Sequence, residues 1–201
     1  QSGKVIRQFK GHSDRFLALV FSPDGSQILT ANLDKTVRLW DVQTGRELRR
    51  FAQTGEVGLV AFAPGGTALW IGDAGVAQLW QIKDGALLRQ IDTGDGIADD
   101  LSPDGAYLLS ALADGRVQVW DAQSGQPLRT LNGHHGEVSA RFVANGRAIL
   151  TASWDKTAIL WDTASGEKLR TFAGHTETVF DADLSPDGVQ VLTASLDMTA
   201  R

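Results

Sequence analysis

Short runs in which apolar and polar residues alternate recur along the whole chain. Residues 37–40 read Val-Arg-Leu-Trp and residues 117–120 read Val-Gln-Val-Trp. A period of two predicts half-buried β-strands, and no stretch shows the sustained periodicity of a helix. Turn-forming sequences such as Ser22-Pro23-Asp24-Gly25 separate the runs, because Pro fixes φ early in a turn and Gly takes the positive φ that ends it. The pattern therefore predicts an all-β chain of short strands joined by tight turns.

The pattern repeats with a period close to 40 residues. Tryptophans mark it at positions 40, 80, 120 and 161, and Asp follows three of the four. The Pro-Asp-Gly type of turn returns in phase at 22–25, 63–66, 102–105, 144–146 and 185–188. Self-similarity at such a period is typical of propeller or solenoid arrays. Each unit is predicted to form four antiparallel strands, which we call a to d in chain order.

Five units follow from this phase, together forming one repeat region over 1–201. They span 11–51, 52–91, 92–131, 132–172 and 173–201, and the last ends inside its strand c. Residues 1–10 include Gly3-Lys4-Val5-Ile6-Arg7-Gln8-Phe9, which matches strand d of the other units. We expect this segment to be the outer strand of a preceding or closing blade.

The phased motifs resemble one known family. Gly11-His12, Trp40-Asp41 and the period near 40 are similar to WD-repeat (WD40) β-propellers, and the resemblance covers essentially the whole chain. It implies a β-propeller of four-stranded antiparallel blades, here an incomplete fragment of a larger propeller with seven or more blades. Five units alone are expected to stay open or to associate end to end.

The resemblance also implies a hydrogen-bonded chain of His, Ser or Thr, Asp and Trp within each repeat. Unit 1 supplies His12, Thr30, Asp34 and Trp40, unit 4 supplies His134, Thr151, Asp155 and Trp161, and unit 5 supplies His175, Thr193 and Asp197. Unit 3 has Ser110, Asp114 and Trp120 without the histidine. Unit 2 also lacks the histidine, and by count it has Trp70 at the threonine position and Ala74 at the aspartate position.

Composition and motifs exclude several kinds of chemistry. There is no cysteine, the net charge is -5, and no apolar run is long enough to span a bilayer, so we expect no thiolate metal site, no nucleic-acid partner and no membrane partner. No nucleophile elbow or phosphate-cradling glycine loop is present. His12, His134 and His175 belong to separate units, and His135 is expected to face solvent. We therefore expect no catalytic residue, no metal, no cofactor and, since no signal-peptide pattern opens the chain, a cytoplasmic location.

Two other charged groups have alternative interpretations. The acidic residues Asp92, Asp95, Asp99 and Asp100 do not fit a calcium-binding EF-hand, so a solvated or channel-facing cluster is favoured. Arginines recur around strand d at positions 46, 49, 89, 129 and 170. Protection of an exposed sheet edge is favoured over a basic rim for nucleic acid.

The candidate partner-binding residues precede strand a in every unit. They are Asp14, Glu56, Asp95, Glu137 and Glu177, joined by Trp154 on a b–c turn. Clustered carboxylates favour a protein or peptide partner with basic segments, although they could simply be solvated and Trp154 could pack against a neighbouring blade. The expected function is a non-enzymatic scaffold or recognition domain. The alternatives are the sensor part of a larger regulatory protein or, less favoured, a hydrolase using loop carboxylates.

Overall fold

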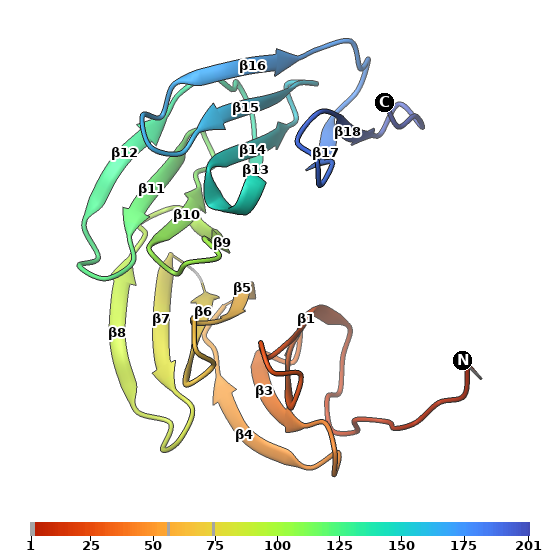
Figure 1. The fold of residues 1–201 in the computed structure, drawn as a ribbon, viewed down its shortest axis with the longest axis vertical. Coiled ribbons are helices and arrows are strands. Elements are labelled where there is room, and N and C mark those ends of the chain that lie inside the picture. The colour runs from red at the N-terminus through yellow and green to blue at the C-terminus, as the bar shows by residue number, and fades with distance from the viewer. Residues whose placement is uncertain (1–2, 56, 74) are drawn as a thin grey trace. The chain divides into compact units, whose positions relative to one another are not determined.

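The computed structural model describes residues 3–55, 57–73 and 75–201, and their regular structure is almost entirely β. The chain forms two compact units, Gln1–Ile91 and Asp92–Arg201 (Figure 1). The first contains the sheets β1-β2-β3-β4 and β5-β6-β7-β8, and the second contains β9-β10-β11-β12, β13-β14-β15-β16 and the two-stranded β17-β18. The prediction of an all-β chain built from four-stranded antiparallel blades is confirmed.

The strands follow the predicted order a to d in each complete sheet. In the first unit they are β1 Phe16–Phe21, β2 Gln27–Asn32, β3 Thr36–Asp41, β4 Glu47–Ala52, β5 Val57–Phe62, β6 Ala68–Asp73, β7 Val76–Gln81 and β8 Leu87–Asp92. In the second they are β9 Ile97–Leu101, β10 Tyr107–Ala111, β11 Val117–Asp121, β12 Pro127–Leu131, β13 Val138–Val143, β14 Ala148–Ser153, β15 Ala158–Asp162, β16 Lys168–Phe172, β17 Val179–Leu184 and β18 Val191–Ser195. A short turn, η1 Ala144–Gly146, replaces the Pro-Asp-Gly turn between β13 and β14, and all three of its residues have positive φ.

Neighbouring sheets bury their faces against each other within each unit. In the first unit Leu29, Val37, Leu69 and Ile71 share one apolar cluster and are fully buried. In the second unit one cluster joins residues of β10 and β11 to residues of β13 and β14. A single four-stranded sheet cannot bury both of its faces, so stacking of sheets provides the core.

One hydroxyl on strand b connects the loops and strands of a blade. In the β13–β16 sheet, Trp161 Nε1 donates to Thr151 Oγ1 at 2.9 Å, and His134 Nε2 lies 2.8 Å from the same oxygen. His134 Nδ1 lies 2.8 Å from Asp155 Oδ2. A neutral imidazole with its proton on Nδ1 satisfies the side chains of Thr151, His134 and Asp155 together. The Thr151 hydroxyl donates to Nε2, and Nδ1–H donates to the Asp155 carboxylate.

The other blades show how far this arrangement extends. In the β1–β4 sheet His12 lies 2.7 Å from Thr30 and 2.9 Å from Asp34, and Trp40 donates to Thr30 at 2.8 Å. In the β17–β18 sheet His175 lies 2.8 Å from both Thr193 and Asp197.

The β9–β12 sheet keeps only part of the network. Trp120 donates to Ser110 at 2.9 Å, but Asp114 is exposed and binds Arg116 at 2.7 Å. The structure does not bring Asp114 to Ser110, because no histidine connects the turn to the strand.

The β5–β8 sheet has a shorter b–c turn than the count from its tryptophan suggests. Asp73 pairs with Val76, whereas the corresponding Asn32 pairs with Thr36, so the turn has two residues instead of three. Ile71 pairs with Gln78, two residues before Trp80, just as Thr30 pairs with Arg38, two residues before Trp40. Ile71 therefore occupies the threonine position, and the prediction that Trp70 occupies it is wrong. Ala74 lies outside the described residues.

Asp73 replaces the missing network in this sheet. Its carboxylate accepts the backbone N–H groups of Thr54 and Gly55, both at 2.7 Å, and is buried. Trp80 Nε1 and Gln53 Nε2 are buried without a hydrogen-bond partner in the described part of the chain. The loop is held in place, but two polar groups lose the partner that histidine and threonine supply elsewhere.

Arginines on the outer strands join consecutive sheets. Arg49 on β4 donates to the carbonyl groups of Ile82, Lys83 and Asp84 at 3.2, 3.1 and 3.0 Å. Arg129 on β12 donates to the carbonyl of Thr163. At these two positions the arginine caps the next c–d turn, a more specific role than the predicted protection of the edge by charge.

The N-terminal segment makes the contacts of an outer strand without forming one. Residues 3–10 have no strand assignment. Nevertheless Arg7 donates to the carbonyl of Thr44 at 3.1 Å, and the Phe9 ring packs edge-on against Trp40 at 5.8 Å, as Phe51 packs near Trp80 at 5.4 Å. Closure of the propeller by this segment stays a prediction.

Replacing Asp155 by Ala should lower the free energy of unfolding by about 2–3 kcal/mol, because His134, Thr157 and the backbone of His135 lose a partly buried acceptor. Asp114→Ala provides the matched control on the corresponding turn. Its pair with Arg116 is exposed, so solvent and salt screen it and its loss should change stability little. Chemical denaturation followed by circular dichroism measures both variants, and equal losses would show that the histidine network does not stabilise the fold.

Trp80→Phe should cost about 1–2 kcal/mol less than Trp161→Phe, because phenylalanine removes a buried N–H that has no partner in one case and a satisfied N–H in the other. The same denaturation measurement compares them. A larger loss for Trp80→Phe would mean that the indole of Trp80 has a partner, such as a water molecule.

Candidate functional site

The loops before strand a and the b–c turns meet on one end of the sheets. Trp154 N donates to the carbonyl of Glu137 at 3.0 Å. Leu33 N donates to Arg15 in the same way at 3.0 Å, and Leu196 N donates to Thr178 at 2.9 Å. This backbone contact places one side chain of each b–c turn next to the start of strand a. We call this end the loop face.

A second buried position fixes the loop face and was missed in the sequence. Asn32 Nδ2 donates to the carbonyl of Asp14 at 2.6 Å, Ser153 Oγ donates to Gly136 at 3.4 Å, and Ser195 Oγ donates to Glu177 at 3.0 Å. All three donors are buried. The signal was available, since each stands two residues after the network threonine.

The candidate carboxylates occupy two different positions on the loop face. Asp14, Asp95 and Glu177 lie two residues before strand a, whereas Glu137 lies directly before it. All four are exposed, and Glu56 lies outside the described residues. In the first unit Arg15 stands where Glu137 stands in the second, so the described negative charge gathers on the second unit, on Asp95, Glu137 and Glu177.

Trp154 is the largest exposed apolar side chain of the loop face in the second unit. It is 60% exposed, which favours recognition over packing against a neighbouring blade. A Cβ atom at Gly136 would lie 3.4 Å from Trp154 Cβ, so the absence of a side chain there leaves the tryptophan room beside the loop.

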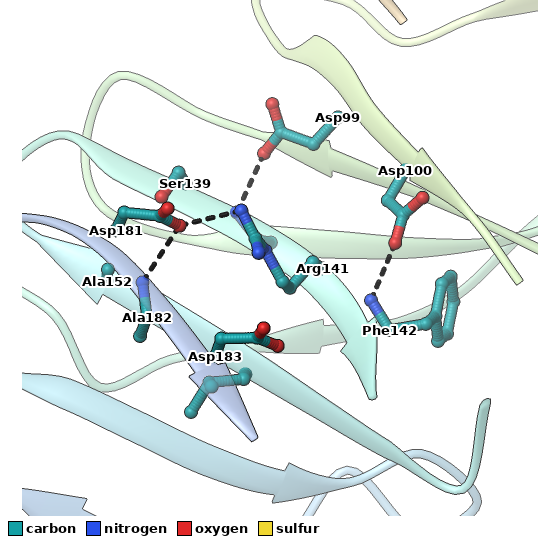
Figure 2. A pocket seen from close by; sticks show the side chains of 11 residues that line it. Asp99, Asp100, Ser139, Arg141, Phe142, Ala152, Asp181, Ala182 and Asp183 are labelled. Carbon is teal, nitrogen blue, oxygen red and sulfur yellow. Dashed lines mark hydrogen bonds and ion pairs between the residues drawn. The ribbon is translucent and has the colours of Figure 1, made fainter. Parts of the chain in front are cut away.

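Four inward-facing aspartates line a separate cavity of about 520 Å³ in the second unit. They are Asp99, Asp100, Asp181 and Asp183 (Figure 2). Asp99 accepts the N–H of Ala140 at 3.1 Å, and Asp100 accepts that of Phe142 at 2.7 Å, so β9 holds the free edge of β13.

Asp181 binds Arg141 across this cavity at 2.6 Å. Asp183 accepts the N–H of the following Leu184 at 2.9 Å. The four carboxylates therefore bind groups of the protein itself, and the cluster joins sheets in addition to lining a cavity.

Burial changes the acidity of two of these aspartates, Asp99 and Asp100. Desolvation raises the pKa of Asp99 to about 7, with a smaller contribution from the neighbouring Asp100, although the N–H of Ala140 opposes the shift. Desolvation also raises the pKa of Asp100. Perturbed carboxyl groups at a cavity are what the hydrolase alternative requires. Their bonds to the main chain of β13 instead assign Asp99 and Asp100 to holding the strand.

The network carboxylates shift in the opposite direction. Burial raises the pKa of Asp155, but hydrogen bonds from Thr157 and His134 outweigh it, and the net pKa is lowered. Burial lowers the pKa of His134 in spite of its aspartate partner. Asp155 is therefore ionised and His134 neutral near pH 7, the state that the bonding pattern requires.

The described part of the chain offers neither a cluster of metal ligands nor a membrane-spanning helix. Within residues 3–55, 57–73 and 75–201, no group of three or more His, Cys, Asp or Glu side chains is placed to hold a metal ion. The described part of the chain also contains no helix with the length and apolar character needed to cross a bilayer.

Comparison with known proteins identifies similar repeats. The profile described as "WD domain, G-beta repeat" matches residues 3–41, 95–121, 125–162 and 166–201, which is more than half of the chain. Residues 42–94 lie outside the matched segments and include the sheet with the shortened turn.

Several curated proteins share the pattern. Protein groucho of Drosophila melanogaster is 38% identical over 68 residues, covering 34% of this chain and 9% of its own length. Pre-mRNA-processing factor 19 homolog 2 of Arabidopsis thaliana is 31% identical over 159 residues, covering 72% of this chain and 30% of its own length. WD repeat-containing protein 82 of Drosophila melanogaster is 26% identical over 184 residues, covering 66% of this chain and 58% of its own length. The chain thus spans less than two thirds of the length of each of these relatives.

The raised pKa of Asp99 predicts a pH dependence of stability. An acid whose pKa is about 7 when folded and about 4 when unfolded binds more protons in the folded state between these values, so stability falls as the pH rises through this range. Asp99→Asn keeps an acceptor for Ala140 and removes the ionisation. The stability of this variant relative to the unchanged protein should therefore increase by about 2–3 kcal/mol from pH 5 to pH 8, since each pH unit between pH 5 and the folded pKa contributes about 1.4 kcal/mol. Denaturant melts at the two pH values measure the difference, and a gain that does not change with pH would contradict the assignment.

Proposed function

The chain belongs to the WD40 repeat family, and from this premise we propose that it is a non-enzymatic interaction module that recognises basic segments of protein partners on its loop face. Its sheets form a protein-interaction scaffold of the kind that this family provides. The observation that carries the proposal is the position of Trp154, an exposed aromatic side chain held by a backbone hydrogen bond beside the exposed carboxylate of Glu137.

The charges of the second unit support a basic partner. Asp95, Glu137 and Glu177 are exposed on the loop face, and exposed carboxylates of one sign attract positive charge and accelerate encounter. Lys156 compensates part of this field, since its Nζ lies 3.9 Å from Glu177 Oε1 and donates to the carbonyl of Thr176 at 2.6 Å. An aromatic anchor next to charged residues is typical of the residues that carry most of the binding energy at protein interfaces.

The scaffold supports recognition better than catalysis. His12, His134 and His175 face a hydroxyl and a carboxylate group of their own blades. The perturbed carboxyl groups of β9 bind the main chain of β13. A module of this kind could also serve as the sensor part of a larger regulatory protein, because its loop face would perform the same recognition there.

Charge reversal at Asp95, Glu137 and Glu177 to Lys should weaken the binding of a Lys- and Arg-containing peptide at least tenfold, since like charges then face each other. Fluorescence anisotropy with a labelled basic peptide from a random library measures the affinity, and a thermal melt checks that the fold is retained. The control variant carries Gln123→Lys, Gln126→Lys and Glu167→Lys, which add positive charge on c–d turns at the opposite end of the sheets. Equal losses in both variants, or a partner footprint on the Pro-Asp-Gly turns, would reject the loop face as the site.

A further inference from the structure

A small cavity opens on the loop face beside Trp154. Its volume is about 160 Å³, and it is open to solvent. Its lining includes Ser139 of β13, Val179 and Phe180 of β17, Glu137 directly before β13 and Trp154 on the turn after β14. Trp154 is 60% exposed and Phe180 is 54% exposed. Two large aromatic side chains therefore stand in solvent at one hollow, which is unusual for a surface that contacts nothing.

The backbone holds both aromatic residues in these exposed positions. The N–H of Trp154 is bound to the carbonyl of Glu137, and the turn is fixed further by Ser153, whose Oγ accepts the N–H of Asp155 at 3.2 Å. The pairing of β17 with β18 shifts register between Val179 and Asp181, so Phe180 lies at an irregularity next to the fully buried Val179. Irregularities of this kind redirect a side chain. The hollow is thus built into the fold.

One carboxylate at this hollow is available to a ligand. Glu137 is exposed, and its side chain has no hydrogen-bond or ion-pair partner in the described part of the chain. Glu177 by contrast faces Lys156, and Lys156 is itself bound to the carbonyl of Thr176. The charge at the cavity is therefore negative and is supplied by Glu137.

We propose that this cavity receives the side chain of an arginine from a protein partner, with the guanidinium between Trp154 and Phe180 and paired with Glu137. The proposal rests on the proposed recognition of basic segments and specifies which basic residue is read. The hollow of about 160 Å³ is small, so it suits the end of one side chain and not a folded element. A planar guanidinium stacks on aromatic faces and binds a carboxylate with two parallel bonds, whereas the ammonium of lysine is a compact and more strongly hydrated charge.

The corresponding positions of two other blades lack this chemistry. Leu33 and Leu196 stand where Trp154 stands, and the residues that bind them through the backbone are Arg15 and Thr178 in place of Glu137. All three sheets share this backbone geometry, but among them only the β13–β16 sheet places an aromatic residue, Trp154, next to a carboxylate, Glu137. These blades also show that leucine fits the turn, so Trp154→Leu is a conservative variant for the test.

The test compares four libraries of acetylated hexapeptides that differ at one fixed position, occupied by arginine, lysine, citrulline or norleucine in a basic background. Fluorescence anisotropy is measured with the unchanged chain and with Trp154→Leu, Phe180→Ala and Glu137→Gln. The arginine library should bind at least tenfold more tightly than the lysine and citrulline libraries. Trp154→Leu and Phe180→Ala should each remove this preference, so that the arginine and lysine libraries bind to either variant with equal affinity. Glu137→Gln should reduce the arginine and lysine affinities together.

The outcomes separate this inference from the proposed function. Equal affinity for arginine and lysine that is lost on charge reversal of the loop face would overturn the arginine cavity and leave the proposed function intact. An arginine preference that persists in Trp154→Leu and Phe180→Ala would place the arginine elsewhere and overturn the assignment. Absence of binding by every library would reject the proposed function and this inference with it.

Discussion

The threonine hydroxyl of strand b is the group on which the loop face depends. Thr151 accepts the indole N–H of Trp161 and donates to His134, so a single oxygen connects strand c, strand b and the loop before strand a. His134 in turn binds Asp155, which accepts three further hydrogen bonds in the b–c turn and the neighbouring loop. The buried hydroxyl uses both its donor and its acceptor role, so loss of any one residue of the network leaves a polar group of another residue without a hydrogen bond. The position of the loops relative to the strands is therefore set inside the sheet.

The β5–β8 sheet shows what the fold retains without that hydroxyl. Ile71 occupies the corresponding position and adds to the apolar core, so Trp80 has no acceptor and Gln53 has no partner for its Nε2. Asp73 nevertheless holds the loop directly through two backbone N–H groups. The apolar packing of this sheet thus substitutes for the network within the core, while the carboxylate substitutes for it at the loop. The cost in stability falls on Trp80 and Gln53, whose side-chain N–H groups stay buried without a hydrogen-bond acceptor among the residues that the structure describes.

Sequence reasoning predicted what depends on local pattern. The alternation around Trp40 and Trp120 and the turn at 102–105 set the strands and their antiparallel order, because strand period and turn chemistry act over a few residues. Counting back from Trp80 failed, since it assumed a turn of constant length, and the register placed Ile71 where Trp70 was expected. Several contacts were beyond any local pattern. The bonds from Arg49 to the next sheet, from Asp99 to β13, and the meeting of Phe180 with Trp154 form only when sheets stack.

The fold separates a constant part of the loop face from a variable part. Leu33, Trp154 and Leu196 share one backbone hydrogen bond and one place beside strand a, yet only one of them is aromatic. A side chain held at a fixed place by buried hydrogen bonds loses little conformational freedom when a partner binds, so its contacts are converted efficiently into affinity. Substitution at that position leaves the network beneath it unchanged, because the hydrogen bonds use the backbone of the turn and the side chains of other residues. Under the proposed function, recognition would therefore change without a change of fold, because the residue at position 154 would contact the partner while the scaffold beneath it stays the same.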